Sequence, residues 1–304
     1  MLNCHSLLYY ENIKGVFFVL KLRGKGQFKE FLVISLCIVM VFAITACSSK
    51  ERTMILATTT STQDSGLLDY LLPVFERDTG IKVKVLAKGT GEAIEVAKRG
   101  DADGLLVHAK SQEVKFVEEG FGTDRLEVMY NDFIIVGPKD DPAKLKEKAP
   151  KDGVEALKLI SSSEANFVSR GDNSGTNTKE LTIWKDAGIT PTGKWYISAG
   201  KGMGAVLTMA SEKKAYTLTD RATYLNMRDT LDLDIVTEKG SQFLNQYALI
   251  RLNPTKNEIK SEEADEFIDW MMSTEGQKLI GEYGKEKYGM PLFTPNAIIT
   301  NAKK

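Results

Sequence analysis

Three segments rich in Ser, Thr and Gly carry side chains that could hold an anion. They read TTTSTQDSG at 58–66, KGTGEA at 88–93 and SRGDNSGTNT at 169–178. Each follows an apolar run and enters an amphipathic one, which places hydroxyls and unpaired backbone N–H groups at a predicted helix N-terminus. Ordinary helix capping would explain any one of them. Three such segments, one of them with an arginine, indicate an oxyanion site built from hydrogen-bond donors.

The third segment also admits other chemistry. A hydrolase built on Ser174 would need a neighbouring base, and the only histidine after Cys47, His108, lies in a predicted strand without triad context. The tripeptide at 170–172 is the Arg-Gly-Asp adhesion signal, a pattern short enough to arise by chance. The Gly-Lys-Ser/Thr of a phosphate-binding loop is absent. No His, Cys or carboxylate cluster has the spacing of a catalytic metal site, so we predict no metal and no cofactor.

The elements that must position these segments follow from hydrophobic periodicity. Short β-branched runs alternate with amphipathic segments, which predicts an α/β fold with parallel sheets. Gly80 and Gly100 stand where helices usually end. The expected strands are 53–60, 81–87, 102–109, 132–137, 165–169, 215–219 and 246–252. The expected helices are 64–80, 91–100, 111–120, 178–188, 204–214, 261–273 and 275–283.

The N-terminal region indicates export. Basic residues between Lys21 and Lys29 precede an apolar run, Phe31 to Ala46, that is short for a membrane span, which predicts a signal peptide over 1–46. The run ends in Ile-Thr-Ala before Cys47 and resembles a bacterial lipobox, so we expect acylation of Cys47, a tether at 47–52 and an extracytoplasmic, membrane-anchored protein. The alternative is a plain signal peptide with an incidental cysteine.

Charge and cysteine usage narrow the class further. After Cys47 the chain has 35 basic and 39 acidic residues, a formal charge of about −4, which gives no reason to expect a nucleic-acid partner. Cys4 and Cys37 lie in the predicted signal peptide and Cys47 would carry the lipid, so the exported part is expected to have no thiol for a disulfide or a zinc site.

The ordered series of motifs resembles a known family. ATTTSTQDSG, KGTGEA, GDADGLLVHA, FVSRGDNSGTNTKELTIWKDAGI, AYTLTDRATYL and NQYALIRLNP are similar to segments of the tungstate-binding proteins of bacterial ABC importers, over about 53–273. Molybdate- and phosphate-binding proteins are more distantly similar. The resemblance implies a type II periplasmic-binding-protein fold, in which two α/β lobes are joined by two crossover strands with a ligand cleft between them. The lobes would comprise 53–133 plus 245–304, and 134–244.

The resemblance also implies roles for particular residues. Arg170 would supply the one full charge on the ligand, Asp172 and Asp220 would orient it or cap a helix, and Asn131 and Asp132 would cap a crossover strand. His108 is expected to be a strand residue with its hydrogen bonds satisfied. Thr217 and Thr219 are further candidates, with a role inside the sheet as the alternative. The complete set of expected ligand donors is Thr59, Thr60, Ser61, Thr90, Gly91, Arg170, Ser174, Gly175, Thr176, Thr217 and Thr219.

We therefore expect a binding protein rather than an enzyme. The resemblance implies a monomer that takes up tungstate and delivers it to an ABC permease driven by a cytoplasmic ATPase. A site made of donors suits a fully deprotonated tetrahedral dianion, which only accepts hydrogen bonds. Molybdate has the same charge and shape, so the choice of tungstate rests on the resemblance, and molybdate, phosphate or sulfate remain alternatives. A secreted hydrolase using Ser174 is a more distant one.

Overall fold

The computed structural model describes residues 51–298. The predicted signal peptide at 1–46, Cys47 and most of the predicted tether lie outside the described residues, as do the last six residues of the chain. From Arg52 onward the chain forms one compact unit. A search of the described helices finds none with the length and apolar character to cross a membrane.

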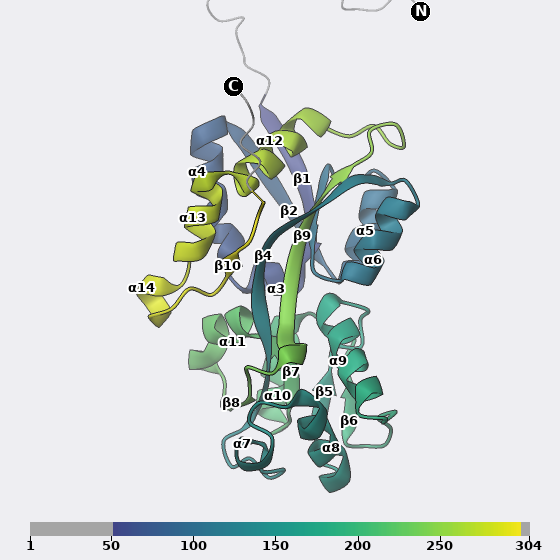
Figure 1. Ribbon diagram of the computed structural model, residues 1–304, viewed down its shortest axis with the longest axis vertical. Coiled ribbons are helices and arrows are strands. Elements are labelled where there is room, and N and C mark those ends of the chain that lie inside the picture. Colours follow the sequence, from purple (N-terminus) through teal and green to yellow (C-terminus); the bar gives the residue numbers. More distant parts are fainter. Residues whose placement is uncertain (1–50, 299–304) are drawn as a thin grey trace, which may run out of the picture. The chain divides into compact units, whose positions relative to one another are not determined.

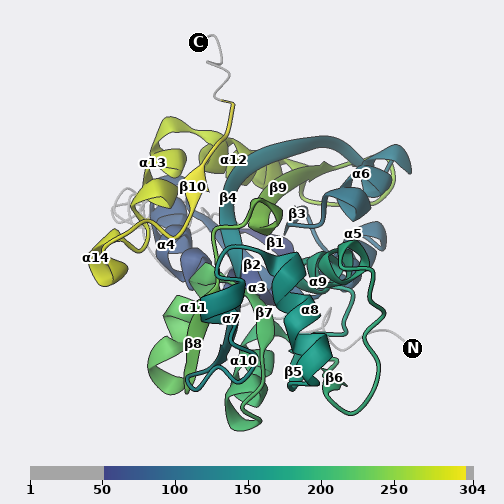
Figure 2. The same cartoon turned by 60° about the horizontal axis from the view of Figure 1, so that its bottom comes forward.

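Two long strands organise this unit. Strand β4 (Gly122–Pro138) pairs antiparallel with β9 (Leu244–Leu252) from Gly122 to Asp132, and its remaining residues pair with β7 (Thr217–Asp220) and β8 (Leu233–Thr237). Strand β4 therefore belongs to two regions of sheet, and in both views it runs beside β9 from one α/β lobe to the other (Figure 1 and Figure 2).

The first lobe contains both ends of the described chain. Its strand order is β10-β4-β9-β3-β1-β2, with β1 parallel to β2 and β3, and β9 antiparallel to β3. Its strands besides β4 and β9 are β1 (Arg52–Thr59), β2 (Ile81–Lys88), β3 (Gly104–Val107) and β10 (Thr294–Pro295). Its helices are α3 (Thr60–Asp64), α4 (Leu67–Thr79), α5 (Thr90–Lys98), α6 (Lys110–Glu118), α12 (Ser261–Met272), α13 (Thr274–Glu282) and α14 (Lys285–Tyr288).

Alternation of side chains along the strands explains why helices cover both faces of this sheet. Met54, Leu56 and Leu106 pack in one core with residues of α4, α12 and α13, whereas Ala57 and Leu105 pack in another with α5 and α6. Successive residues of a strand point to opposite faces, so a strand buried on both sides is apolar throughout. Figure 1 shows α5 and α6 on the opposite side of the strands from α4 and α13.

The second lobe is formed by the middle of the chain. Its core contains Phe133, Phe167, Trp184 and Tyr216, all buried. The strands β5 (Phe167–Ser169) and β6 (Tyr196–Ser198) form a separate parallel pair, while β7 and β8 extend the sheet along β4. Its helical segments are α7 (Leu145–Lys148), α8 (Gly153–Ser163), α9 (Gly175–Asp186), α10 (Met203–Glu212), α11 (Arg221–Met227), η1 (Arg228–Thr230) and η2 (Ser241–Phe243).

The predicted fold class is confirmed, with a correction to the sheet. The expectation of parallel sheets is wrong for β4, β7, β8 and β9. Strand β4 pairs antiparallel with each of the other three, and β9, which brings the chain back to the first lobe, is antiparallel to β3 as well. Gly80 ends α4 in the left-handed conformation as predicted, with φ of 72°. The helices α3, α7, α8, α11 and α14 and the short strands β6, β8 and β10 were not predicted. The residue boundaries assigned to the two lobes stay a prediction.

Asn131 and Asp132 do not cap a crossover strand, because both lie inside β4. Asn131 Oδ1 accepts a hydrogen bond from Asn245 Nδ2 of β9 at 2.8 Å. Asp132 forms an ion pair with Arg221 at 2.6 Å at the start of α11. Asn131 therefore connects β4 to β9, and Asp132 connects β4 to α11.

Candidate oxyanion site

The structure brings the three Ser/Thr/Gly segments together at helix N-termini. Thr60 and Ser61 begin α3, Thr90 begins α5, and Ser174 is the N-cap of α9. The backbone N–H of Gly175 donates to Thr90 Oγ1 at 3.1 Å. The hydroxyls of Ser61 and Thr176 lie 3.4 Å apart. Segments of the first lobe thus contact the segment of the second lobe directly.

Arg170 lies at the centre of these contacts. Its side chain is 1% exposed, and it donates from Nη1 to Ser61 Oγ at 2.8 Å and from Nη2 to Thr60 Oγ1 at 2.9 Å. Its Nε is buried and finds no hydrogen-bond partner among the described residues. A buried donor without an acceptor costs free energy, about 1–3 kcal/mol, unless a ligand supplies the acceptor. This unpaired N–H is therefore the strongest local indication of a bound anion.

Asp172 orients Arg170, as predicted. Its Oδ2 accepts from Arg170 Nη2 at 2.6 Å, and its Oδ1 accepts from the backbone N–H of Ser174 at 3.2 Å. Between these residues Gly171 has φ of 61°, and a Cβ there would lie 2.0 Å from Ser198 Oγ. Only glycine fits this turn, which lets the carboxylate reach back to the guanidinium.

Helix termini add positive potential to the same region. Ser174 Oγ accepts from the N–H of Asn177 at 3.2 Å, which caps α9. Helix α10 also begins here, because a Cβ on its N-cap Gly202 would lie 3.2 Å from Thr60 Oγ1. The N-termini of α9 and α10 therefore lie beside the segments that contact Arg170, and the positive ends of their helix dipoles raise the potential there. Some of their first N–H groups already have partners, since that of Gly175 donates to Thr90 Oγ1 and that of Gly204 donates to Asp64 Oδ2.

Asp220 is a fully buried carboxylate at the start of α11. It accepts from the backbone N–H of Thr223 at 2.9 Å and from Thr223 Oγ1 at 2.7 Å, so it caps the helix as predicted. Burial raises the pKa of Asp220 to about 6, because desolvation outweighs these hydrogen bonds and the attraction of Arg170. The carboxylate is ionised above that pH, and it accepts from Thr223 of its own helix and from Asn131 Nδ2 of β4 at 3.4 Å.

His108 is a neighbour of this site that the sequence did not reveal. It follows β3 directly, is 6% exposed, and bonds to Thr59 Oγ1 through Nε2 at 3.1 Å and to Asn245 Oδ1 through Nδ1 at 2.9 Å. Its hydrogen bonds are satisfied as expected, although it lies after the strand rather than in it. A signal was available in the sequence, because His108 follows a predicted strand. Ligands bind at the carboxyl ends of parallel strands, where the first Ser/Thr/Gly segment also lies.

Not every expected donor joins the cluster. Thr217 Oγ1 donates to Val168 O at 2.7 Å and Thr219 Oγ1 to Asp220 O at 3.2 Å, so within residues 51–298 no hydrogen bond links either hydroxyl to Arg170. Gly91 makes only ordinary contacts, since an added Cβ would lie 3.6 Å from Gln112 Oε1. The expected donors that the structure connects directly are Thr60, Ser61, Thr90, Arg170, Gly175 and Thr176.

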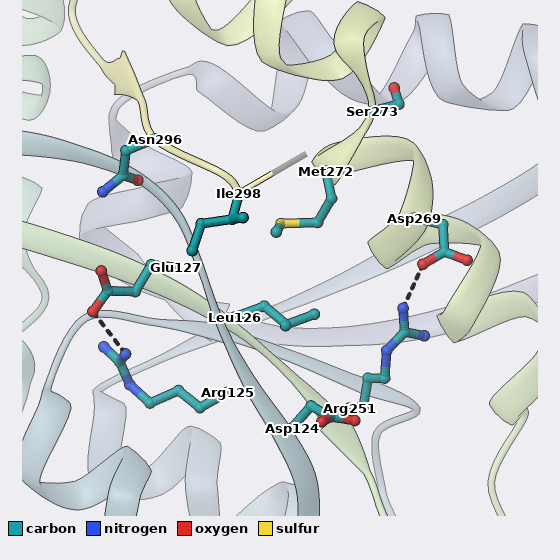
Figure 3. A pocket seen from close by; sticks show the side chains of 10 residues that line it. All are labelled: Asp124, Arg125, Leu126, Glu127, Arg251, Asp269, Met272, Ser273, Asn296 and Ile298. Atoms are coloured by element: carbon teal, nitrogen blue, oxygen red, sulfur yellow. Dashed lines mark hydrogen bonds and ion pairs between the residues drawn. The ribbon is translucent and has the colours of Figure 1, made fainter. Parts of the chain in front are cut away.

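A separate cavity of about 870 Å³ lies in the first lobe, and Figure 3 shows the side chains that line it. Its arginines are already paired with carboxylates, Arg125 with Glu127 at 2.9 Å and Arg251 with Asp269. Carboxylates thus balance both cations of this cavity, and although Arg125 Nη2 has no hydrogen-bond partner among the described residues, Glu113 and Glu127 already neutralise its charge. Over the described residues, no group of three or more His, Cys, Asp or Glu side chains could hold a metal ion.

Comparison with known proteins agrees with the fold and the motifs. Residues 45–275 match the family model described as a PBP superfamily domain. The chain is 54% identical to the tungstate-binding protein TupA of Peptoclostridium acidaminophilum, over 87% of this chain and 97% of the relative. It is 40% identical to the tungstate-binding protein TupA of Campylobacter jejuni, over 78% of this chain and 88% of the relative.

Two solved structures of tungstate-transport proteins are also similar to this chain. A crystal structure described as the tungstate ABC transporter from Geobacter sulfurreducens is 48% identical with a TM-score of 0.72, covering 77% of this chain and 100% of that chain. The tungstate-binding protein TupA from Desulfovibrio alaskensis is 42% identical with a TM-score of 0.66, covering 81% and 99%.

Proposed function

The chain belongs to the PBP superfamily and, within it, to the family of TupA tungstate-binding proteins, and from this membership we propose that it is the tungstate-binding component of an ABC importer. Proteins of this family are solute-binding proteins, not enzymes. The proposal names the oxyanion tungstate as the ligand and the contact region around Arg170 as its site.

The observation that carries the proposal is the buried guanidinium of Arg170, which is surrounded by hydroxyls and helix N-termini and retains one unpaired N–H. A tetrahedral dianion has only acceptor oxygens, so it matches a region that presents donors. The proposed ligand contacts are Thr60, Ser61, Thr90, Arg170, Ser174, Gly175 and Thr176. Thr59, Gly91, Thr217 and Thr219 remain predicted contacts without this support.

The expected hydrogen-bond energies are large enough for tight binding of tungstate. Roughly seven hydrogen bonds to charged oxygens at about 1.5–3 kcal/mol each give about 10–20 kcal/mol of gross stabilisation. Association costs about 4–15 kcal/mol, and nanomolar affinity requires a net value of about −12 kcal/mol. Affinity of this order is within reach because the donors lie in a buried, preorganised region, where water competes little for them.

Isothermal titration calorimetry of the purified protein tests the proposal. We expect one tungstate per chain with a dissociation constant in the nanomolar range, and competition titrations with molybdate, phosphate and sulfate rank the alternatives. Phosphate should bind much more weakly, since at neutral pH it carries a proton that needs an acceptor. Absence of both heat and thermal shift with micromolar tungstate would contradict the proposed ligand.

Replacing Ser174 by alanine separates binding from hydrolysis. We expect the free energy of unfolding to fall by about 1 kcal/mol, because the N-cap of α9 is lost. Tungstate should bind about tenfold more weakly, as expected for one lost hydrogen bond to a charged ligand. Calorimetry and thermal unfolding measure both. Ser162→Ala, an exposed site in α8, is the matched control. A protein in which Ser174→Ala abolishes turnover of an ester would instead be a hydrolase.

We further propose an extracytoplasmic location, with a lipid anchor on Cys47 and delivery of the anion to a membrane permease coupled to an ATPase. In bacteria that express the full chain, metabolic labelling with a clickable fatty acid should label the wild type. Cys47→Ser should lose the label and leave the membrane fraction, while Cys37→Ser, inside the predicted signal peptide, should keep it. Equal labelling of Cys47→Ser and the wild type would refute the anchor.

A further inference from the structure

A chain of buried hydrogen bonds connects Asp220 to the first segment of the proposed site, and its direction can be deduced. Above its pKa of about 6 the Asp220 carboxylate only accepts, and Asn131 Nδ2 donates to its Oδ1 at 3.4 Å. The amide oxygen of Asn131 therefore faces the other way and accepts from Asn245 Nδ2 at 2.8 Å. Asn245 Nδ2 also donates to the Tyr247 hydroxyl at 3.1 Å.

These contacts determine the tautomer of His108. With its amide nitrogen used by Asn131 and Tyr247, Asn245 presents Oδ1 to His108 Nδ1 at 2.9 Å, so Nδ1 must carry the hydrogen. Burial lowers the pKa of His108 to about 4, so the ring is neutral at physiological pH and has a single N–H. Its Nε2 is then an acceptor, and Thr59 must donate its hydroxyl hydrogen to it across 3.1 Å.

The ring cannot easily turn over to exchange its two nitrogens. It stacks on Tyr247, with centroids 4.7 Å apart and planes at 26°. On another side the α9 start approaches so closely that a Cβ on Gly175 would lie 2.7 Å from Nδ1. Both contacts hold the imidazole plane in one orientation.

As a consequence, the neighbouring hydroxyls of this segment have different hydrogen-bond partners. The Thr58 hydroxyl donates to Leu106 O at 2.7 Å, and the Thr59 hydroxyl donates to His108. Thr59 Oγ1 accepts from Thr62 N at 3.1 Å and lies 2.8 Å from Thr62 Oγ1, whose hydrogen must point toward it because that of Thr59 is already used. Thr60 and Ser61 differ, since their oxygens accept from Arg170 and neither hydroxyl hydrogen is committed by that contact. The Ser61 hydroxyl also meets Thr176 Oγ1 at 3.4 Å, and Thr176 can be the donor of that long contact, which leaves the Ser61 hydrogen for a ligand.

We propose that His108 is a positioning residue of the oxyanion site. Its Nε2 accepts a hydrogen bond from the Thr59 hydroxyl and so fixes the start of α3. Thr60 and Ser61 are then the hydroxyls of this segment that donate to the ligand. The inference rests on the proposed function for the identity of the ligand, but the hydrogen-bond direction does not depend on it. It also reassigns Thr59 from an expected ligand donor to a residue that holds the loop.

Two variants of His108 test the role, because the two amide side chains reproduce different ring nitrogens. Asn places its amide near Nδ1 and can keep the bond to Asn245, whereas the longer Gln places an acceptor near Nε2 and can keep the bond to Thr59. We expect His108→Asn to weaken tungstate binding about tenfold, the value of one lost hydrogen bond. His108→Gln should stay within about threefold of the wild type. Equal losses in both variants would mean a purely structural role.

Nitrogen-15 NMR of the wild-type protein provides a readout that needs no variant to fold. We expect the resonances of a neutral ring with Nδ1 protonated, unchanged from pH 7 to 8, where Asp220 is ionised. A ring protonated at Nε2, or a cationic one, would overturn the inference. If the wild type shows the expected tautomer but no heat with tungstate, the proposed ligand fails while the hydrogen-bond chain stands.

Discussion

Replacing Arg170 by alanine is expected to weaken tungstate binding by about 1,000-fold, because two charge-assisted hydrogen bonds of about 1.5–3 kcal/mol each, together about 3–6 kcal/mol, are lost. The guanidinium is the charge at the centre of the contacts, and Thr60 and Ser61 are held by it. Lysine at this position keeps the charge but loses the fork, so Arg170→Lys should bind with intermediate affinity.

Calorimetry and thermal unfolding together check this result. The alanine variant should keep a cooperative unfolding transition and lose the shift in melting temperature that tungstate produces in the wild type. Arg77→Ala is the matched control, because Arg77 is largely exposed and, within residues 51–298, forms an ion pair only with its neighbour Asp78. Binding by Arg170→Ala within tenfold of the wild type would mean that the anion lies elsewhere.

Replacing Gly175 by alanine is expected to weaken tungstate binding about 100-fold, the cost of misplacing a site by about 1 Å. A Cβ there would lie 2.7 Å from both Nδ1 and the carbonyl oxygen of His108, which belongs to the first lobe. The added methyl should therefore hold the start of α9 away from Thr90 and the first segment. No backbone strain contributes, because Gly175 is not among the glycines with positive φ.

A second glycine serves as control for this prediction. An added Cβ on Gly91 would lie 3.6 Å or more from its neighbours, so Gly91→Ala should bind within about threefold of the wild type. Alanine is also the better helix former, so neither variant should destabilise its helix. If calorimetry finds Gly175→Ala as tight as the wild type, the contact between α9 and His108 does not limit binding.

The sequence predicted those parts of the fold that depend on local patterns. The helix over 64–80 was visible because its apolar spacing and Gly80 are contained within the segment, and α4 with its left-handed cap confirms both. The direction of β4, β7, β8 and β9 was not visible, because a strand has the same alternation whether its neighbour is parallel or antiparallel. Only the route of the whole chain decides that.

The same division holds for the site. The three segments could be found because capping residues are local, and their meeting at Arg170 followed from the family resemblance. His108 and Asn245 lie 137 positions apart in the sequence, and no local pattern around either residue predicts the hydrogen bond between them. Hydrogen-bond direction is also invisible in the sequence, which explains why Thr59 was grouped with Thr60 and Ser61 although its hydroxyl faces the protein.

The pairing of β4 with β9 limits how the two lobes can move. Backbone hydrogen bonds connect these strands from Gly122 opposite Leu252 to Asp132 opposite Leu244, so neither strand can slide along the other without breaking a ladder. We therefore expect the lobes to move against each other by bending of these two strands rather than by sliding of one past the other. Such bending would separate Arg170 of the second lobe from Thr60 and Ser61 of the first without disrupting the ladder itself.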